Sequence, residues 1–158
     1  MVQIRFSITS PLPPDRILAA ATDFSDRRPE VWKGIDPTRY RVHAAGDTWA
    51  DVTEGGRELG GIWARERYDW SSPGTVVAEV QESNVFRPGS RWELRVRPAG
   101  DGGSTIDWLT VRHPRGFKGR VLVVMLALSG RRYLTRYLRR TLEGLETTAA
   151  ETGRQGEE

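Results

Sequence analysis

The chain contains no cysteine among its 158 residues. Disulfides, thiolate nucleophiles, zinc–thiolate sites and iron–sulfur clusters are therefore excluded. A long hydrophobic run is also missing from the N-terminal segment 1–10, which alternates polar and apolar residues and so lacks the continuous apolar stretch of a signal peptide. We therefore expect a cytoplasmic protein.

Histidine is scarce. The two histidines, His43 and His113, are far apart and have no carboxylate-rich cluster beside them in the sequence, so they indicate neither a metal site nor a catalytic triad. The glycine patterns of a phosphate-binding loop and of a dinucleotide-binding turn are absent as well. We expect no metal and no cofactor.

Acidic residues are missing from one long segment. Trp108–Leu142 contains no Asp or Glu but nine Lys or Arg residues, whereas the whole chain has a formal net charge of only +3. The basic character therefore belongs to this C-terminal segment, and the remainder of the chain is acidic.

Seven segments alternate polar and apolar residues with the period of a half-buried strand. They recur about every ten residues and are separated by Gly- and Pro-rich turns, which favours an antiparallel sheet. The expected strands are 2–9, 40–44, 49–54, 62–70, 75–81, 92–97 and 106–110. Two short helices are expected after the first strand: one opens at Pro14 and ends near Asp23, and the other carries Trp32 and stops at Gly34.

The last element is a long helix over about 117–148, because no proline interrupts this segment. Such a helix is ~45 Å long, whereas a domain of this size has a radius of gyration of only ~15 Å. Its first half, Val121–Leu128, is apolar all round but too short to span a bilayer, which needs ~20 residues. We therefore expect a curved sheet to enclose it on every side. Residues 1–148 form one domain in this prediction, and 149–158 form a polar C-terminal tail.

The order of these elements resembles the START/Bet v 1-like (SRPBCC) superfamily, and within it the bacterial polyketide cyclase/dehydrase and lipid-transport-like proteins. The segments that carry the resemblance are Ser10-Pro11, Asp23-Phe24, Trp32, Glu66–Gly74, Gly89–Trp92, Gly102–Trp108 and Pro114–Gly116. The resemblance implies an α+β helix-grip fold: a seven-stranded curved antiparallel sheet around the C-terminal helix, with two short helices after the first strand. It also implies a cavity between sheet and helix. Because the superfamily includes carriers, sensors and cyclases, it leaves open whether the chain is an enzyme.

Glu66 is the candidate catalytic residue. By alternation it shares the inward face of its strand with Tyr68, where an unpaired carboxylate costs several kcal/mol to desolvate. It is therefore either a ligand-binding or acid–base group, or one half of a structural ion pair with Arg112 or Arg41. A different strand register would place it outside.

Aromatic residues of the same inward parity are candidates to line the cavity, although they would equally serve to fill the core. The full set of expected ligand-binding residues is Trp32, Tyr40, Glu66, Tyr68, Trp92, Trp108, Thr110, Arg112 and Met125.

Three functions remain open from the sequence. The first is binding or transport of a small hydrophobic ligand, lipid or polyketide-like, between sheet and C-terminal helix. The second is a polyketide cyclase or aromatase that uses Glu66 as acid and base. The third is a protein-interaction module whose cavity is filled.

The Arg-rich C-terminal helix also has three interpretations. Nucleic acid is not expected, because the basic residues lack interleaved exposed aromatics. Peripheral contact with an anionic membrane is the second interpretation. The third is a solvated face that pairs with acidic residues of this chain or of a second subunit in a homodimer.

Overall fold

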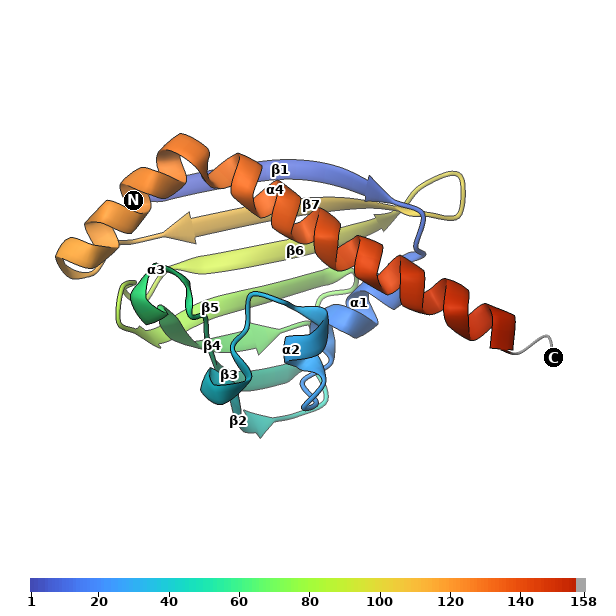
Figure 1. Ribbon diagram of the computed structural model, residues 1–158, viewed down its shortest axis with the longest axis horizontal. Coiled ribbons are helices and arrows are strands. Elements are labelled where there is room, and N and C mark those ends of the chain that lie inside the picture. The colour runs from blue at the N-terminus through green and yellow to red at the C-terminus, as the bar shows by residue number, and fades with distance from the viewer. Residues whose placement is uncertain (156–158) are drawn as a thin grey trace.

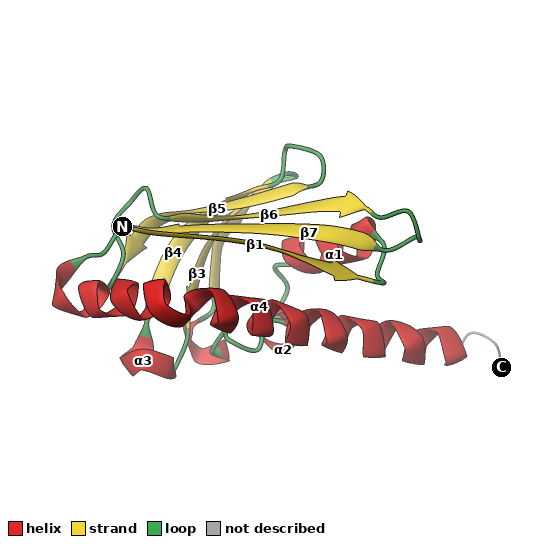
Figure 2. Ribbon diagram, turned by 90° about the horizontal axis from the view of Figure 1, so that it is seen from above, coloured by secondary structure: helices red, strands yellow, loops and turns green. Residues whose placement is uncertain are grey.

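A computed structural model describes the backbone of residues 1–155 and the side chains of residues 1–57 and 60–150. It shows one curved sheet with a long C-terminal helix crossing one face (Figures 1 and 2). The elements are β1 (Val2–Ser10), α1 (Pro14–Thr22), α2 (Arg28–Val31), a 3₁₀ turn η1 (Pro37–Arg39), β2 (Arg41–Ala45), β3 (Trp49–Gly55), α3 (Glu58–Gly61), β4 (Trp63–Asp69), β5 (Thr75–Ser83), β6 (Arg91–Pro98), β7 (Ser104–Arg112) and α4 (Gly116–Gln155).

The seven strands form a single antiparallel sheet in the order β1-β7-β6-β5-β4-β3-β2. All connections are therefore between neighbours except the one that leads from β1 through α1 and α2 to β2 at the opposite edge. This is the expected α+β helix-grip architecture.

Strict alternation makes one face of the sheet apolar. In β1 every second residue is buried, from Val2 to Ser10, and the residues between them are exposed. The buried apolar residues of every strand except β2 join Leu138 and Leu142 of α4 in a single hydrophobic cluster. Burial of these side chains drives the packing of helix on sheet.

The sheet does not enclose the first half of α4, so this expectation is wrong. Leu122 and Val123 are buried, but Val124 is 58 % exposed and Leu128 is 84 % exposed. The physical reason is the position of the helix. Among the strands α4 packs chiefly along β1, the edge strand, so only the side of the helix that faces β1 is covered. Figure 1 shows that the helix changes direction before it crosses the sheet.

The ends of two helices also differ from expectation. The second short helix is a single turn, Arg28–Val31, followed by the 3₁₀ turn η1. A further short helix, α3, interrupts the β3–β4 connection and was not expected.

α4 continues to Gln155, past the end expected near Thr148 and into the segment expected to be a polar tail. Residues 156–158 of that segment lie outside the described residues.

Two glycines of α4 provide a matched test of this packing. At Gly119 a Cβ would overlap the backbone carbonyl oxygen of Val85, whereas at Gly144 nothing lies within 4 Å. We expect Gly119→Ala to destabilise the protein by ~1–3 kcal/mol through overpacking. Gly144→Ala should instead stabilise it by ~0.5–1 kcal/mol through helix propensity. Urea unfolding of both variants measures this, and equal effects at the two sites would contradict the close approach of α4 to Val85.

Candidate functional site

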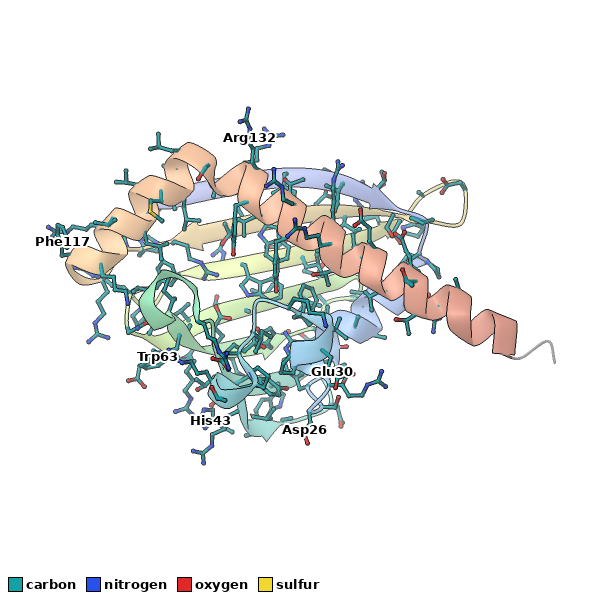
Figure 3. All side chains as sticks on the ribbon, in the orientation of Figure 1. Asp26, Glu30, His43, Trp63, Phe117 and Arg132 are labelled. Atoms are coloured by element: carbon teal, nitrogen blue, oxygen red, sulfur yellow. The ribbon has the colours of Figure 1, made fainter. Side chains whose placement is uncertain are left out.

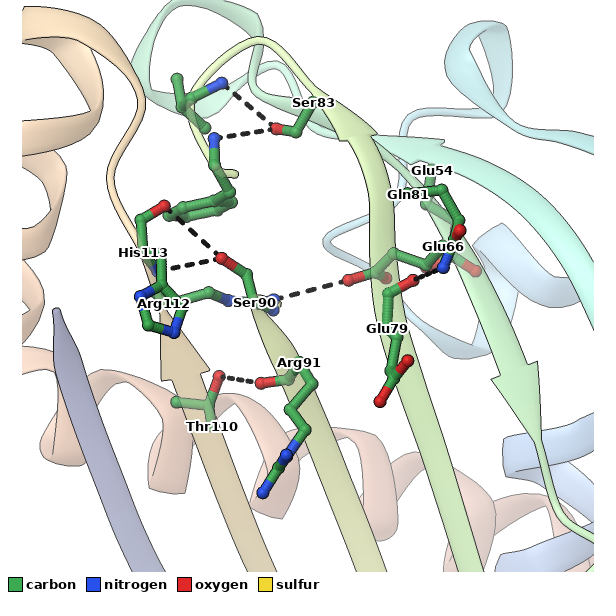
Figure 4. Close-up of polar contacts among 12 residues, drawn as sticks. Glu54, Glu66, Glu79, Gln81, Ser83, Ser90, Arg91, Thr110, Arg112 and His113 are labelled. Carbon is green, nitrogen blue, oxygen red and sulfur yellow. Dashed lines mark hydrogen bonds and ion pairs between the residues drawn. The ribbon is translucent and has the colours of Figure 1, made fainter. Parts of the chain in front are cut away.

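Five polar side chains form a chain of contacts across the concave face of the sheet. We call this set the buried ion chain: Arg28, Glu54, Tyr68, Glu66 and Arg112. Arg28 Nε donates to Glu54 Oε1 at 2.5 Å, and the Tyr68 hydroxyl donates to Glu54 Oε2 at 2.9 Å. The same hydroxyl lies 3.4 Å from Glu66 Oε2, and Arg112 Nη1 lies 3.5 Å from Glu66 Oε1. Figure 4 shows Glu66 between Arg112 and Glu54.

Strand pairing brings these residues together. β3 and β4 pair in a register that places Ala50 opposite Tyr68 and Val52 opposite Glu66. Glu54 is two residues beyond Val52 on the same inward face, so the two carboxylates point into the same space. Arg112 ends β7 on that face, and its guanidinium lies 5.0 Å from the centre of the Phe86 ring.

Arg28 anchors the other end of the chain. It is only 2 % exposed although it belongs to a single helical turn. Its Nη1 donates to the backbone oxygens of Ala21 and Asp23, and its guanidinium lies 4.3 Å from the centre of the Phe24 ring. These contacts replace the water that a buried guanidinium loses.

Burial sets the electrostatics of the site. Loss of water raises the pKa of Glu66, and the nearby Glu54 raises it further, whereas Arg112 opposes the shift without cancelling it. Burial and the same two carboxylates hold the pKa of Tyr68 well above its usual range. Tyr68 therefore stays a hydrogen-bond donor, and Glu66 takes up a proton more readily than an ordinary carboxyl.

A cavity of about 270 Å³ that opens widely to solvent lies beside the buried ion chain, between the sheet, the loop after α2 and α4. Its polar wall consists of Glu54, Glu66 and Arg112. The rest of its lining is mainly apolar or aromatic: Ile35, Ile62, Trp63, Ala64, Phe86, Tyr133 and Tyr137, with Gly34, Gly55 and Gly56. Burial raises the pKa of Tyr137, so its hydroxyl also stays protonated.

The structure brings two of the nine expected ligand-binding residues, Glu66 and Arg112, to the wall of this cavity. Tyr68 lies next to it as the link between the two carboxylates. The expected inward parity of Glu66 is confirmed, because this residue is only 5 % exposed. Its ion pair with Arg112 is one of the two pairings that the sequence suggested.

The other expected residues do not line the cavity. The indoles of Trp92 and Trp108 stack at 5.0 Å and fill the interior on the β6–β7 side. The Trp32 indole donates to the backbone oxygen of Ala20. The remaining three lie elsewhere: the Tyr40 hydroxyl donates to Phe24 O, the Thr110 hydroxyl donates to Arg91 O, and Met125 is 39 % exposed on α4. Their contact with a ligand stays a prediction.

Sequence reasoning missed Glu54, Arg28 and Tyr137. Glu54 is on the same inward face of its strand as Val52, and the alternation of the strand could have indicated this. The Gly55-Gly56 pair that follows suggested a turn instead. Arg28 carries no comparable signal, because a single helical turn has no periodicity. Tyr137 lies in the amphipathic stripe of α4, which predicts burial but not a cavity.

Three further features of the described residues concern metal ligands, membrane spans and buried polar groups. Among the side chains that the structure describes, no group of three or more His, Asp or Glu residues is placed to hold a metal ion. No helix within the described residues is long and apolar enough to cross a membrane. The Trp108 indole N–H is buried and has no hydrogen-bond partner among the described residues.

The fold and the cavity define a protein of the START/Bet v 1-like superfamily. Residues 1–150 match the family described as polyketide cyclase/dehydrase and lipid transport, and the chain belongs to this family. A search of the curated proteins finds no significant match.

Solved structures show the same fold at low sequence identity. A protein from Thermus thermophilus is 15 % identical with a TM-score of 0.75, over 93 % of this chain and 99 % of the other. A START superfamily protein from Mycobacterium smegmatis is 12 % identical with a TM-score of 0.72, over 90 % and 98 %. The Zhui aromatase/cyclase from a Streptomyces species is 13 % identical with a TM-score of 0.70, over 92 % and 93 %.

The raised pKa of Glu66 makes stability depend on pH in a defined direction. Above the ordinary value of 4.5, the folded state retains the proton that the unfolded chain loses. The free energy of unfolding of the wild type therefore falls as pH rises through this window, and Glu66→Gln removes this contribution. Urea unfolding of both proteins from pH ~4.5 to ~7.5 should show a stability difference that shifts in favour of the variant as pH rises.

The aspartates with lowered pKa are an internal control. Hydrogen bonds with Ser25 and Ser71 lower the pKa of Asp23 and Asp69. The stability that these two aspartates contribute is lost only as pH falls below about 3.8, and the loss is equal in the wild type and in the variant. A stability difference that stays constant across the window would show that Glu66 is ionised in the folded state throughout.

Proposed function

We propose that the chain binds a small, mainly apolar molecule with at least one polar group in the cavity between the sheet and α4. The observation that carries this proposal is the wall of the cavity, where a buried carboxyl and a guanidinium face an otherwise apolar and aromatic space. Such a combination of apolar lining and few convergent polar groups is typical of small-molecule sites. Membership of a family described by both cyclase and lipid-transport activities supports the same class of ligand.

The volume of the cavity is sufficient for one or two rings, and its open side would let a longer chain extend outward. An apolar cavity of about 150 Å³ accommodates benzene, and the volume here is about 270 Å³. A planar polyketide-like fragment therefore fits the cavity. Its oxygen would accept a hydrogen bond from Arg112, while its rings would contact Phe86 and Tyr137.

Cyclase or aromatase chemistry is the second candidate, and the raised pKa of Glu66 favours it specifically. A carboxylate with raised basicity can remove a proton from the carbon next to a carbonyl. The electron pair of that C–H bond then forms the enolate, whose oxygen the Arg112 guanidinium would stabilise. The enolate carbon attacks a second carbonyl of the same substrate, and protonated Glu66 returns its proton to the alkoxide that forms. In dehydration Glu66 removes a further proton from the carbon next to the carbonyl and delivers it to the new hydroxyl, which leaves as water. A neighbour in fold, Zhui, is an aromatase/cyclase.

An interaction module with a filled cavity has less support, because a cavity lies at the charged site.

Filling the cavity should weaken binding without unfolding the protein. Ala64 lines the cavity, and Ala64→Phe would occupy it, whereas Ala45→Phe makes the same change on the exposed edge strand β2. We expect 2-naphthol to quench the intrinsic fluorescence of the wild type and of Ala45→Phe. Ala64→Phe should bind it at least about tenfold more weakly. Unchanged binding by Ala64→Phe would contradict the proposed site, as would the absence of any binding by the wild type.

Turnover separates the two candidates. If the chain is a cyclase, incubation with a linear poly-β-ketone should give a cyclised product. Glu66→Gln should slow this by about 10²–10⁴-fold, the usual contribution of an acid–base group. Binding by that variant should persist, as measured by the same quenching. If the wild type binds without turnover, cyclase activity is excluded and binding or transport remains as the function.

A further inference from the structure

The first third of α4 carries a contiguous apolar surface that no part of the described chain covers. We call it the α4 apolar face: Phe117, Val121, Val124, Met125 and Leu128. Phe117 is 82 % exposed and Leu128 84 % exposed, and the other three are between 39 % and 58 % exposed. Spacings of four, three and four residues place Phe117, Val121, Val124 and Leu128 along one line of the helix. Contiguous exposed apolar surface marks a contact site more often than scattered residues do.

Basic residues border this face on both sides. At about 100° per residue, Arg120 and Arg131 project beside one edge of the apolar line, and Lys118 and Arg132 beside the other. All four are exposed. In Figure 3, Phe117 projects from the N-terminal end of α4, and Arg132 projects outward near the point where the helix changes direction. The segment Trp108–Leu142 has no acidic residue that would neutralise these cations.

The α4 apolar face continues toward the ligand cavity. A surface groove of about 240 Å³ runs between Ile62 and the start of α4, where it is lined by Phe117, Val121 and Met125. Ile62 also lines the cavity beside the buried ion chain. Ile62 therefore borders both the exposed groove and the cavity.

We propose that the α4 apolar face docks the protein on the surface of an anionic lipid bilayer. An apolar strip flanked by long basic side chains fits such a surface, because the strip enters the acyl boundary while the Arg and Lys stems reach the phosphates. Each basic residue adds attraction to anionic lipid. The charge pattern disfavours a second copy of this chain as the occupant, because a two-fold pairing of this face would place two sets of cations against each other. The proposal goes beyond ligand binding and does not depend on it.

Vesicle flotation tests the proposal with the full chain. We expect binding to vesicles of phosphatidylcholine and phosphatidylglycerol in equal parts. Vesicles of phosphatidylcholine alone should bind far less, and binding should weaken as salt is added. The double variant Phe117→Ser, Leu128→Ser should lower the bound fraction at least about tenfold, because it removes the two most exposed apolar groups.

Two further variants complete the design. Val42→Ser removes an exposed apolar side chain on β2, far from α4, and should bind as the wild type does. Arg131→Glu with Arg132→Glu keeps the apolar line and should abolish the preference for anionic vesicles. Circular dichroism should confirm that every variant retains its fold.

Three results would overturn the proposal. The first is a wild type that does not float with anionic vesicles. The second is a Phe117→Ser, Leu128→Ser variant that floats as well as the wild type. The third is a homodimer in sedimentation equilibrium that this variant dissociates, together with no vesicle binding, which would assign the face to a second copy. The 2-naphthol experiment tests the cavity separately, and its outcome does not change the interpretation of vesicle flotation.

Discussion

The width of the sheet is the constraint on which the rest of the structure depends. Seven strands spaced at ~4.8 Å span ~29 Å across their concave face, whereas one helix with its side chains covers only ~10–12 Å. α4 lies over the β1 side (Figure 2). The apolar face above the central strands must therefore be covered by something else. α1 packs against β5 and β6, and the indoles of Trp92 and Trp108 stack on the inner face of β6 and β7. The space above β3 and β4 is left as a cavity.

The charged residues gather where this covering is incomplete. Glu54 and Glu66 would each cost several kcal/mol to bury alone, and each is paired with one guanidinium and in reach of the Tyr68 hydroxyl. The formal charges of the two carboxylates and the two guanidinium groups sum to zero. A well-packed apolar core of equal volume is commonly no less stable than such an ion pair. Stability alone therefore gives little reason for this arrangement, whereas a polar group beside an apolar cavity gives a ligand its orientation.

Strand parity predicted a large part of this site, and its failures have physical causes. Alternation in β4 placed Glu66 and Tyr68 inside, because a strand has only two faces and Ala64 and Trp70, which share their face, are apolar. It could not tell which inward aromatics of the strands, such as Trp92, fill the core and which border a cavity, because parity does not say what lies opposite a side chain. That depends on the position of α4 over the sheet, which no local pattern encodes. Arg28 was missed because one helical turn is too short for periodicity to appear.

The same constraint explains why an apolar helix surface stays exposed. A segment that is apolar all round indicates burial on all sides when considered alone, but a helix along the edge strand β1 can be covered on one side only. Val123 faces the core and Val124 faces solvent, although they are neighbours with identical side chains. An uncovered apolar face is an aggregation risk that substitution with polar residues would remove without loss of packing. The presence of Phe117 and Leu128 there, bordered by cations and close to the cavity, is therefore explained better by a partner surface than by folding.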